Sequence, residues 1–295
     1  MNCPSLNELP RPPIGRIGWP WTEESARLPG EIALASSLPV VSVITPSYNQ
    51  GNYLEETIRS VLLQGYPKLE YIVLDGGSQD RSLEILNKYS PWFSYWVSEP
   101  DRGQSDAINR GLNKATGQFA TWINSDDLLC KNALSDHATE IGFDDTTVYA
   151  GYCVYINDKS ERSSVHRGRV NSLEDLLRIK TVWRSQPHRG HIVQPEVLFP
   201  RDLAISVGGV NPENHFTMDY ELWGKLFLAG AKFQYTDVLF GMFREHASQK
   251  TYNAMRQTRS LLKTAKDLVE RADILSPTAK IEILAELESY RLQYE

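Results

Sequence analysis

The sequence predicts an α/β protein with a largely parallel sheet, on the basis of three observations. Short β-branched runs alternate with stretches of helical periodicity through the first half of the chain, the pattern of strands joined by crossover helices. These runs end in polar or glycine-rich segments, where open α/β sheets usually bind ligands. The 295 residues are 41% hydrophobic and 23% charged, as in an ordinary globular protein with a sizeable core.

The first strand is expected at residues 40–45, a β-branched run that ends at Pro46, and a helix follows it. Asn52 is expected to cap this helix, with Glu55 at its third position. The apolar residues of the buried face recur at helical spacing: Leu54, Ile58, Val61 and Leu62.

A second strand is expected at residues 69–74, and it leads into Asp75 and two glycines. Gly76 and Gly77 would let the backbone approach a ligand closely, although an ordinary turn explains them equally well. The helix that follows should turn three residues inward: Leu83, Leu86 and Tyr89.

A third strand, at residues 93–98, precedes a helix that begins near Gln104. Ala107, Ile108 and Leu112 form its inner face. Asp106 and Asn109 lie close to that face, where they either hydrogen-bond loop backbone or contact a ligand, because buried polar groups need partners.

Residues 118–123 read as a buried strand that runs directly into polar residues. The side chains of Asn124, Ser125, Asp126 and Asp127 offer oxygen atoms, the ligands that Mg²⁺ or Mn²⁺ prefers when shared with substrate phosphates. The alternative is structural, since these residues are also suited to cap the next turn or helix.

The second half of the chain should supply a binding site for an acceptor. Residues 146–156 and 162–170 are expected to form the two strands of a hairpin, and Ser172 should cap a short helix. A loop with His188 and His191 follows, and we reject these two as a zinc site because further ligands at suitable spacing are missing.

Later helices begin near Asp219 and near residue 251. Leu222, Trp223, Leu226 and Phe227 form an apolar stripe on the first of these. The charges of the last helices are mixed, which favours docking on the protein itself, or a homodimer through these helices, over binding to lipid.

Composition and charge exclude several classes of protein. A net charge of −6 and a pI near 5.6 argue against binding nucleic acid. The apolar runs are shorter than the ~20 residues that span a bilayer, and the start of the chain lacks the pattern of a signal peptide. Cys3, Cys130 and Cys153 suit neither a disulfide framework nor a zinc site. We therefore expect a cytoplasmic protein, with attachment to the inner face of the membrane left open.

Residues 1–38 are proline-rich and without clear periodicity, so we expect an irregular arm. Trp19 and Trp21 make it too aromatic for a free tail. We expect both to pack onto the main domain, in preference to stacking on a sugar.

Six motifs of the chain occur in the order and spacing of family 2 glycosyltransferases, which it therefore resembles over residues 38–250. The motifs are Val41-Ser-Val-Ile-Thr-Pro-Ser-Tyr-Asn49, Asp75-Gly-Gly-Ser-x-Asp80, Glu99-Pro-Asp-x-Gly103, Asp106-Ala-x-Asn109, Ala115-Thr-Gly117 and Asn124-Ser-Asp-Asp127. The resemblance implies the A-type glycosyltransferase fold, with a Rossmann-like mixed sheet, helices on both faces and additional C-terminal helices.

The resemblance also implies a site for a nucleotide-diphosphate sugar. Its expected nucleotide-binding residues are Thr45, Pro46, Tyr48, Asp75, Gly76, Ser105, Asp106, Asn124 and Ser125. Asp126 and His246 would hold Mn²⁺ or Mg²⁺, and Arg244 would pair with nearby carboxylates. Asp219 would be the general base that removes the proton of the acceptor hydroxyl, with Glu221 as the fallback.

The implied organisation has three parts: an arm at residues 1–38, a glycosyltransferase domain at 39–250 and helices at 251–295. Within the domain, residues 39–130 would bind the nucleotide sugar and residues 131–250 the acceptor, a glycan or a lipid-linked acceptor.

Two positions differ from the family's pattern. Asn124 replaces the first Asp of the D-x-D motif, and Gly76 stands where many relatives have a second Asp. The expected function is an inverting, metal-dependent glycosyltransferase of surface polysaccharide or glycolipid synthesis. The alternative is a non-catalytic protein that binds a nucleotide sugar or glycan on the same fold. A nucleotidyltransferase would need a glycine-rich triphosphate loop near the first strand, and residues 46–49 do not provide one.

Overall fold

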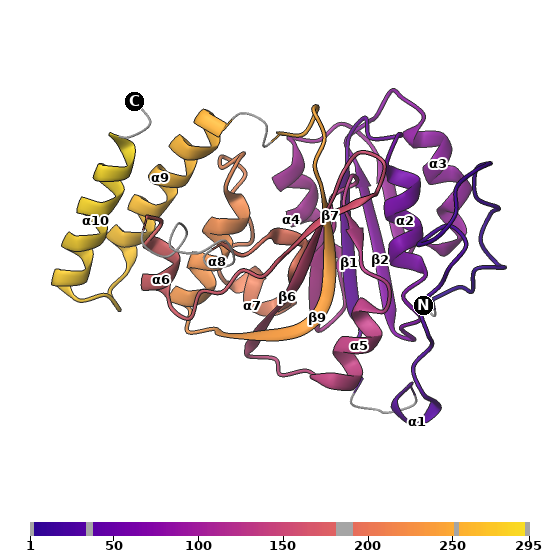
Figure 1. Cartoon of the computed structure of the whole chain (residues 1–295), viewed down its shortest axis with the longest axis horizontal. Coiled ribbons are helices and arrows are strands. Elements are labelled where there is room, and N and C mark those ends of the chain that lie inside the picture. The colour runs from indigo at the N-terminus through magenta and orange to yellow at the C-terminus, as the bar shows by residue number, and fades with distance from the viewer. Residues whose placement is uncertain (1–2, 34–37, 181–190, 251–253, 293–295) are drawn as a thin grey trace.

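The computed structural model describes residues 3–33, 38–180, 191–250 and 254–292, and one mixed sheet runs through them (Figure 1). Its strands follow the order β3-β2-β1-β4-β8-β6-β9-β5, with β7 beside β6. The first four strands are parallel: β1 (Val41–Ser47), β2 (Leu69–Asp75), β3 (Tyr95–Ser98) and β4 (Phe119–Trp122). Because β1 lies between β2 and β4, the strand order reverses at β1, which is where such sheets bind ligands.

The other half of the sheet is mixed. Its strands are β5 (Leu128–Leu129), β6 (Thr147–Ile156), β7 (Arg162–His166), β8 (Val197–Pro200) and β9 (Lys232–Arg244). Strand β8 is antiparallel to both β4 and β6, whereas the long β9 is parallel to β6. The predicted hairpin is confirmed as β6 and β7.

Two hydrophobic clusters cover the two faces of the sheet, because neighbouring residues of a strand point to opposite sides. Val43 belongs to the cluster under α2 (Leu54–Leu62), α3 (Ser82–Tyr89) and α5 (Ala133–Glu140). Ile44 belongs to the cluster under α4 (Gln104–Lys114) and the later helices. The predicted mixed sheet with helices on both faces is therefore confirmed.

Short elements complete the chain between these layers. They are α1 (Gly30–Ala33), η1 (Ser90–Trp92), α6 (Leu173–Leu177), η2 (Gln194–Glu196) and α7 (Arg201–Ser206). Ser172 caps α6 through the amide of Asp175, as predicted.

Two local predictions about helices are wrong. The N-cap of α2 is Tyr53 and makes no side-chain capping bond, because the turn before the helix places Asn52 one residue too early and Glu55 bonds Lys88 and Tyr89 instead. Leu83 is 43% exposed, since α3 turns Ile85, Leu86 and Tyr89 inward.

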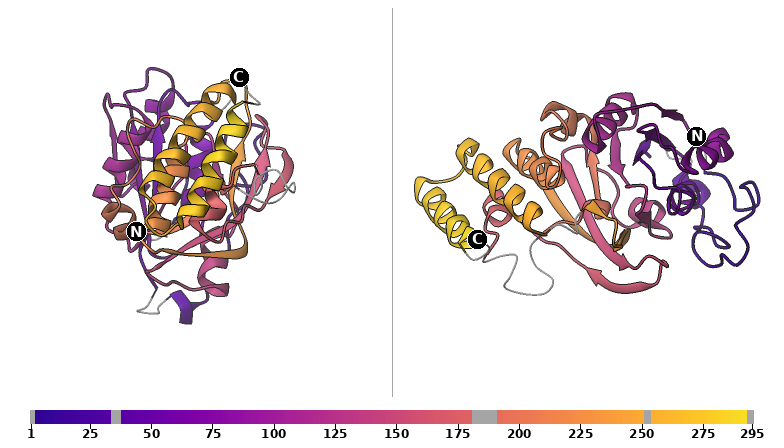
Figure 2. Two further views of the ribbon diagram at one scale, coloured as in Figure 1. Left: turned by 90° about the vertical axis from the view of Figure 1, so that its left-hand side faces the viewer. Right: turned by 90° about the horizontal axis from the view of Figure 1, so that it is seen from above.

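The C-terminal helices α9 (Ala254–Arg271) and α10 (Pro277–Arg291) pack side by side on α8 (Met218–Leu228) and α6 (Figure 2). A Cβ atom on Gly224 of α8 would lie 2.4 Å from Cδ1 of Leu268, so α8 and α9 approach closely at this glycine. Ile283 and Leu287 bury the inner face of α10. The sequence favoured two outcomes for these helices, docking on the same chain or forming a homodimer. The structure shows them docked on the same chain. No helix in the described ranges combines the length and apolar character needed to cross a membrane.

The N-terminal arm is fixed to the domain by Arg59 of α2, whose side chain is fully buried. Its guanidinium donates hydrogen bonds to the carbonyl oxygens of Pro10, Pro20 and Trp21 at 2.9–3.1 Å. Trp21 is buried, and Nε1 of Trp19 donates to the carbonyl oxygen of Leu129. The prediction that both tryptophans pack onto the domain is confirmed.

Arg59→Met should lower the free energy of unfolding by about 3 kcal/mol, because three backbone carbonyls, two of them in buried hydrogen bonds, lose a charged donor. Urea unfolding measures this change, and limited proteolysis should cut the arm faster. Arg81→Met is the matched control, because Arg81 is 56% exposed and lies 4.0 Å from Glu55. Equal stability and equal protease resistance of Arg59→Met and Arg81→Met would contradict this account of the arm.

Candidate active site

A cleft of about 1120 Å³ opens at the carboxyl ends of the parallel strands. Pro46 and Tyr48 line it from the end of β1, Gly76 from the end of β2, and residues 124–127 from the end of β4. The cleft is also lined by the residues around the start of α8, residues 248–250 and part of α9. The order reversal of the sheet therefore places a large cavity where the sequence predicts a ligand.

Seven of the predicted site residues line this cleft. They are Pro46, Tyr48, Gly76, Asn124, Ser125, Asp126 and Asp219. Tyr48 is 61% exposed, so its ring is available to a planar ligand.

Four predicted nucleotide-binding residues are not among those that line the cleft. Thr45 is buried and bonds the hydroxyl of Tyr71, and Ser105 is directed at the sulfur of Met218. The carboxylate of Asp75 accepts hydrogen bonds from Ser78 and Ser98, and that of Asp106 from Arg102. Each of these side chains has a protein partner in the structure, and its contact with a nucleotide stays a prediction.

The sequence left open whether Asn109 of α4 hydrogen-bonds loop backbone or contacts a ligand, and the structure shows a bond to loop backbone. Its side chain donates to the carbonyl oxygen of Val210 and accepts from the amide of the same residue, at 2.7 and 3.0 Å. Asn109 therefore holds the loop before α8 in place. His188, which the sequence analysis rejected as a zinc ligand, lies outside the described residues.

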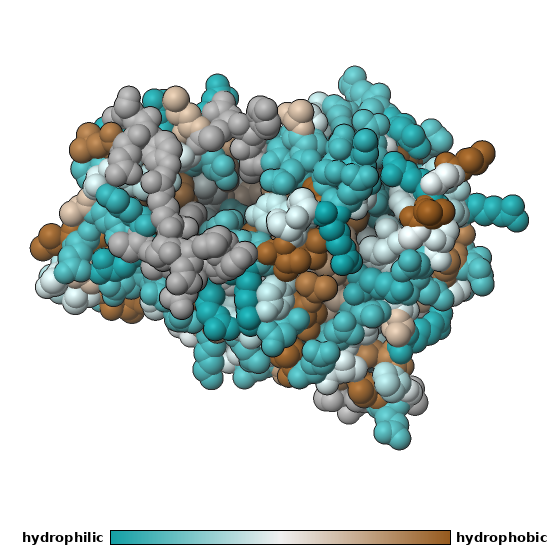
Figure 3. Space-filling model, viewed as in Figure 1, coloured by the Kyte–Doolittle hydropathy of each residue, from teal (hydrophilic) through white to brown (hydrophobic). Residues whose placement is uncertain are grey.

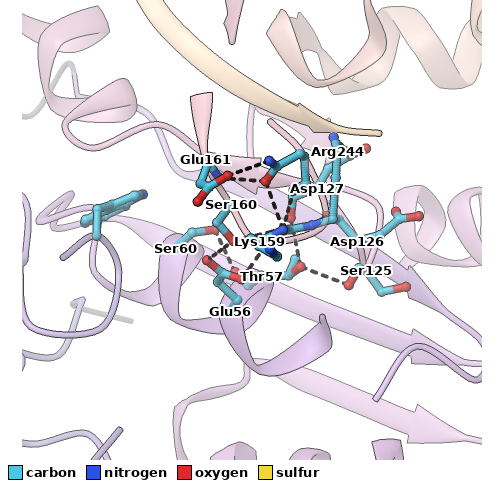
Figure 4. Close-up of polar contacts among 12 residues, drawn as sticks. Glu56, Thr57, Ser60, Ser125, Asp126, Asp127, Lys159, Ser160, Glu161 and Arg244 are labelled. Carbon is cyan, nitrogen blue, oxygen red and sulfur yellow. Dashed lines mark hydrogen bonds and ion pairs between the residues drawn. The ribbon is translucent and has the colours of Figure 1, made fainter. Parts of the chain in front are cut away.

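Arg244, at the end of β9, holds the loop that carries the acidic motif (Figure 4). Its side chain is fully buried, and its Nε donates to the carbonyl oxygen of Asp126 at 2.7 Å. Its Nη2 lies 3.1 Å from Oε2 of Glu56, and its backbone amide donates to Asp127. The expected pairing of Arg244 with a carboxylate is confirmed, and the partner is Glu56 of α2.

The same network fixes the motif from two further sides. Thr57 donates to the carbonyl oxygens of Ser125 and Asp127, and Ser160 of the β6–β7 turn bonds both Glu56 and Arg244. Burial and the charge of Asp126 raise the pKa of Asp127 well above its ordinary value. Asp127 is thus a buried structural carboxyl, while Asp126 is 19% exposed toward the cleft.

The two predicted metal ligands lie next to each other. Nε2 of His246 is 3.0 Å from Oδ2 of Asp126, and Nδ1 of His246 contacts the hydroxyl of Ser248. The carboxylate oxygen of Asp126 suits Mn²⁺ or Mg²⁺, whereas the imidazole nitrogen of His246 is the softer of the two predicted ligands. Within the described residues, no cluster of three or more His, Cys, Asp or Glu side chains could hold a metal. A cation here would take its other ligands from a substrate phosphate and water.

Asn124 is oriented by a chain of directional hydrogen bonds. Nζ of Lys250, which can only donate, lies 3.2 Å from Oε1 of Gln104, so Nε2 of Gln104 is the donor to Oδ1 of Asn124 at 2.7 Å. Nδ2 of Asn124 then donates to Oδ2 of Asp127 at 3.0 Å. The amide of Asn124 thus bridges Gln104 and Asp127, whereas an Asp at position 124 would place two carboxyl groups side by side.

Asp219 lies in the first turn of α8 and lines the same cleft as the acidic motif. Loss of solvent around its carboxyl raises the pKa of Asp219 above the ordinary 3.8, and the positive charge of Lys250 opposes this shift. Glu221 lies outside the lining of the cleft and accepts hydrogen bonds from Asn211 and Asn214. Its placement therefore favours Asp219 over Glu221 as the base.

Three residues of this site were missed or given no role by sequence reasoning. Glu56 reads as an ordinary residue of a helical first turn, and Gln104 and Lys250 lie at the ends of motifs without a distinctive pattern of their own. Only their position next to the motifs could have drawn attention to Gln104 and Lys250.

The model of "Glycosyl transferase family 2" matches residues 42–201 of the chain. The chain belongs to glycosyltransferase family 2. An uncharacterized glycosyltransferase of Rickettsia prowazekii is 29% identical over 223 residues, which are 74% of this chain and 68% of that protein. The putative teichuronic acid biosynthesis glycosyltransferase TuaG of Bacillus subtilis is 30% identical over 177 residues, covering 56% of this chain and 70% of TuaG.

Solved structures confirm the A-type glycosyltransferase fold. S. aureus TarS 1-349 in complex with UDP-GlcNAc matches with a TM-score of 0.56 and 20% identity over 84% of this chain and 71% of that one. The mannosyltransferase PcManGT from Pyrobaculum calidifontis, in complex with GDP-Man and Mn²⁺, matches with a TM-score of 0.58 and 21% identity over 85% and 69%.

Arg244→Met should lower the free energy of unfolding by about 3–5 kcal/mol, because it leaves the Glu56 carboxylate buried without its partner. The double variant Glu56→Met/Arg244→Met should recover part of this loss, since no buried charge remains. Chemical unfolding of the single and double variants measures both effects.

Lys131→Met serves as the control, because Lys131 pairs with Glu23 at the surface and its side chain is 40% exposed. That change should cost less than about 1 kcal/mol. An Arg244→Met variant as stable as the Lys131→Met control would refute the importance of the buried pair.

Proposed function

We propose that this glycosyltransferase moves a sugar from a nucleotide-diphosphate sugar to the hydroxyl group of an acceptor, with inversion at the anomeric carbon. The observation that carries the proposal is that Asp126 and Asp219 line the same cleft, and that the pKa of Asp219 lies above its ordinary value. This arrangement suits a leaving diphosphate on one side and an attacking hydroxyl on the other.

The donor would lie on the side of the parallel strands, within the half formed by residues 39–130. Pro46, Tyr48 and Gly76 are available to the nucleoside, and Asn124 and Ser125 to the sugar diphosphate. The complexes of TarS with UDP-GlcNAc and of PcManGT with GDP-Man support a donor of this class.

Asp126 and His246 would hold Mn²⁺ or Mg²⁺, which neutralises negative charge on the leaving diphosphate. Their 3.0 Å contact and the partial exposure of Asp126 fit a cation that the substrate helps to bind. The Mn²⁺ in the PcManGT complex supports this role. The buried Arg244 and Glu56 keep the Asp126 backbone in place.

Asp219 would accept the proton of the acceptor hydroxyl. As that proton moves to the carboxylate, the hydroxyl oxygen forms its bond to the anomeric carbon, and the bond from this carbon to the phosphate oxygen breaks. The nucleotide diphosphate leaves with the electron pair of the broken bond. Attack from the face opposite the leaving group inverts the anomeric configuration.

The acceptor would occupy the half formed by residues 131–250. The volume of about 1120 Å³ exceeds the usual range of about 300–1,000 Å³ for one small ligand, which leaves room for two substrates. The similarity to TuaG supports a glycan or lipid-linked acceptor in polysaccharide synthesis.

A second candidate function is non-catalytic binding of a nucleotide sugar or glycan, which the neutral Asn124 favours. Nucleotide binding without donor hydrolysis or sugar transfer would support that candidate. Transfer to any acceptor would exclude it.

Asp219→Asn should reduce kcat by about 10²–10⁴-fold, because the amide cannot accept the proton of the hydroxyl. Nucleotide affinity should be unchanged, since Asp219 lies on the acceptor side. The matched control is Glu221→Gln, two residues along the same helix, which should retain transfer. Full activity of Asp219→Asn in a nucleotide-release and product assay would sink the assignment.

The pH profile should carry the signature of Asp219. Only the ionised carboxylate accepts a proton, so kcat/KM should fall as the pH drops through a pKa that lies above the ordinary 3.8. The Lys250 ammonium favours the ionised form, so Lys250→Met should raise this pKa and move the acidic limb to higher pH. A limb that stays in place or moves to lower pH would contradict this electrostatic coupling.

A further inference from the structure

Residues 10–20 of the N-terminal arm form a closed loop that projects from the domain. The guanidinium of Arg59 binds both of its ends, through the carbonyl oxygens of Pro10 and Pro20. The two large apolar side chains at the tip of the loop are exposed to solvent instead of packed inside the protein. Ile14 is 106% exposed and Ile17 is 80% exposed, the largest values among the exposed large hydrophobic residues of the described chain.

The loop has a defined conformation, so this exposure is built into it. The amides of Trp21 and Thr22 both donate to the carbonyl oxygen of Gly18, and the Gly18 amide donates to the Thr22 hydroxyl. Gly15 and Gly18 adopt φ values of +85° and +78°, which other residues rarely take. These features hold the tip in an outward position.

The tip of the loop carries a positive net charge, whereas the net charge of the whole chain is negative. Arg11 and Arg16 are exposed beside the two isoleucines, and residues 10–20 contain no Asp or Glu, whereas the whole chain has a net charge of −6. Arg16 lies over the ring of Trp21, which keeps its charge at the base of the tip. Figure 3 shows apolar groups that project at the right edge of the molecule, over the N-terminal arm.

We propose that this loop docks the protein on an anionic membrane surface, with Ile14 and Ile17 inserted at the boundary of headgroups and acyl chains. Arg11 and Arg16 would contact the negatively charged headgroups. The tip lies at the end of the molecule opposite α9 and α10 (Figure 1), so the C-terminal helices do not cover it.

The size of the tip favours lipid over a protein partner. The eleven residues 10–20 are fewer than the roughly 20–30 residues that each partner contributes to a standard protein interface. An acyl boundary needs no complementary shape, because apolar side chains partition into it individually. The inference does not depend on the proposed transfer reaction.

Co-sedimentation of the full chain with vesicles tests the proposal. The protein should pellet with phosphatidylcholine vesicles that contain phosphatidylglycerol, and much less with phosphatidylcholine alone. Ile14→Asn/Ile17→Asn should lower the partition coefficient at least about tenfold, since two isoleucines no longer insert into the bilayer. Arg11→Gln/Arg16→Gln should weaken binding and reduce its dependence on salt.

Ile281→Asn is the matched control, because Ile281 is 69% exposed on α10, away from the arm. It should bind vesicles like the unaltered protein, and all variants should unfold at similar temperatures. The proposal is overturned if the unaltered protein ignores anionic vesicles, or if Ile14→Asn/Ile17→Asn binds them equally well. It is also overturned if the two isoleucines instead mediate self-association, measured by sedimentation velocity without lipid.

Discussion

The buried ion pair between Arg244 and Glu56 is the interaction on which the candidate active site depends. Arg244 ends β9 and Glu56 lies in α2, so the pair ties the last strand of the sheet to the helix that follows its first strand. The remaining donors of the guanidinium reach the backbone of Asp126 and the turn between β6 and β7. A buried charge without a partner is strongly unfavourable, so these four segments are held to one arrangement. The loop after β4 therefore has a fixed backbone, from which Asp126 can face the cleft.

This arrangement also explains why a neutral Asn124 fits the acidic motif of the chain. Asp127 is already buried at 3.0 Å from the side chain of residue 124, where a second carboxylate would be repelled. The amide instead donates to Asp127 and accepts from Gln104, which Lys250 orients. His246 lies beside Asp126 and, under the proposed function, would offer the second protein ligand that a carboxylate at position 124 would otherwise provide. The departure from the family's motif is thus matched by its surroundings.

Much of the fold could be predicted because its strands carry local signals. The β-branched run that forms β1 and the apolar run before Asn124 are visible without any partner. The residues that face the cleft are less predictable, because strand alternation and existing partners decide which side chains are free. Thr45 points to Tyr71 and Asp75 to two serines, while Pro46 and Gly76, their neighbours, reach the cleft. Glu56 could not be identified at all, since its partner lies 188 residues away and no local pattern links the two. The predicted cap of α2 was wrong because a capping motif in the sequence does not fix where the preceding turn ends.

The central claim is that the cleft binds a nucleotide diphosphate through a metal at Asp126 and His246. A thermal-shift panel of UDP, GDP, CDP and dTDP, each with and without Mn²⁺, tests it most directly. At about 100 times its dissociation constant, the correct nucleotide should stabilise the protein by about 2.7 kcal/mol. We predict a shift with one nucleotide that requires Mn²⁺ and disappears in Asp126→Ala. No shift with any nucleotide, with or without the metal, would contradict the account.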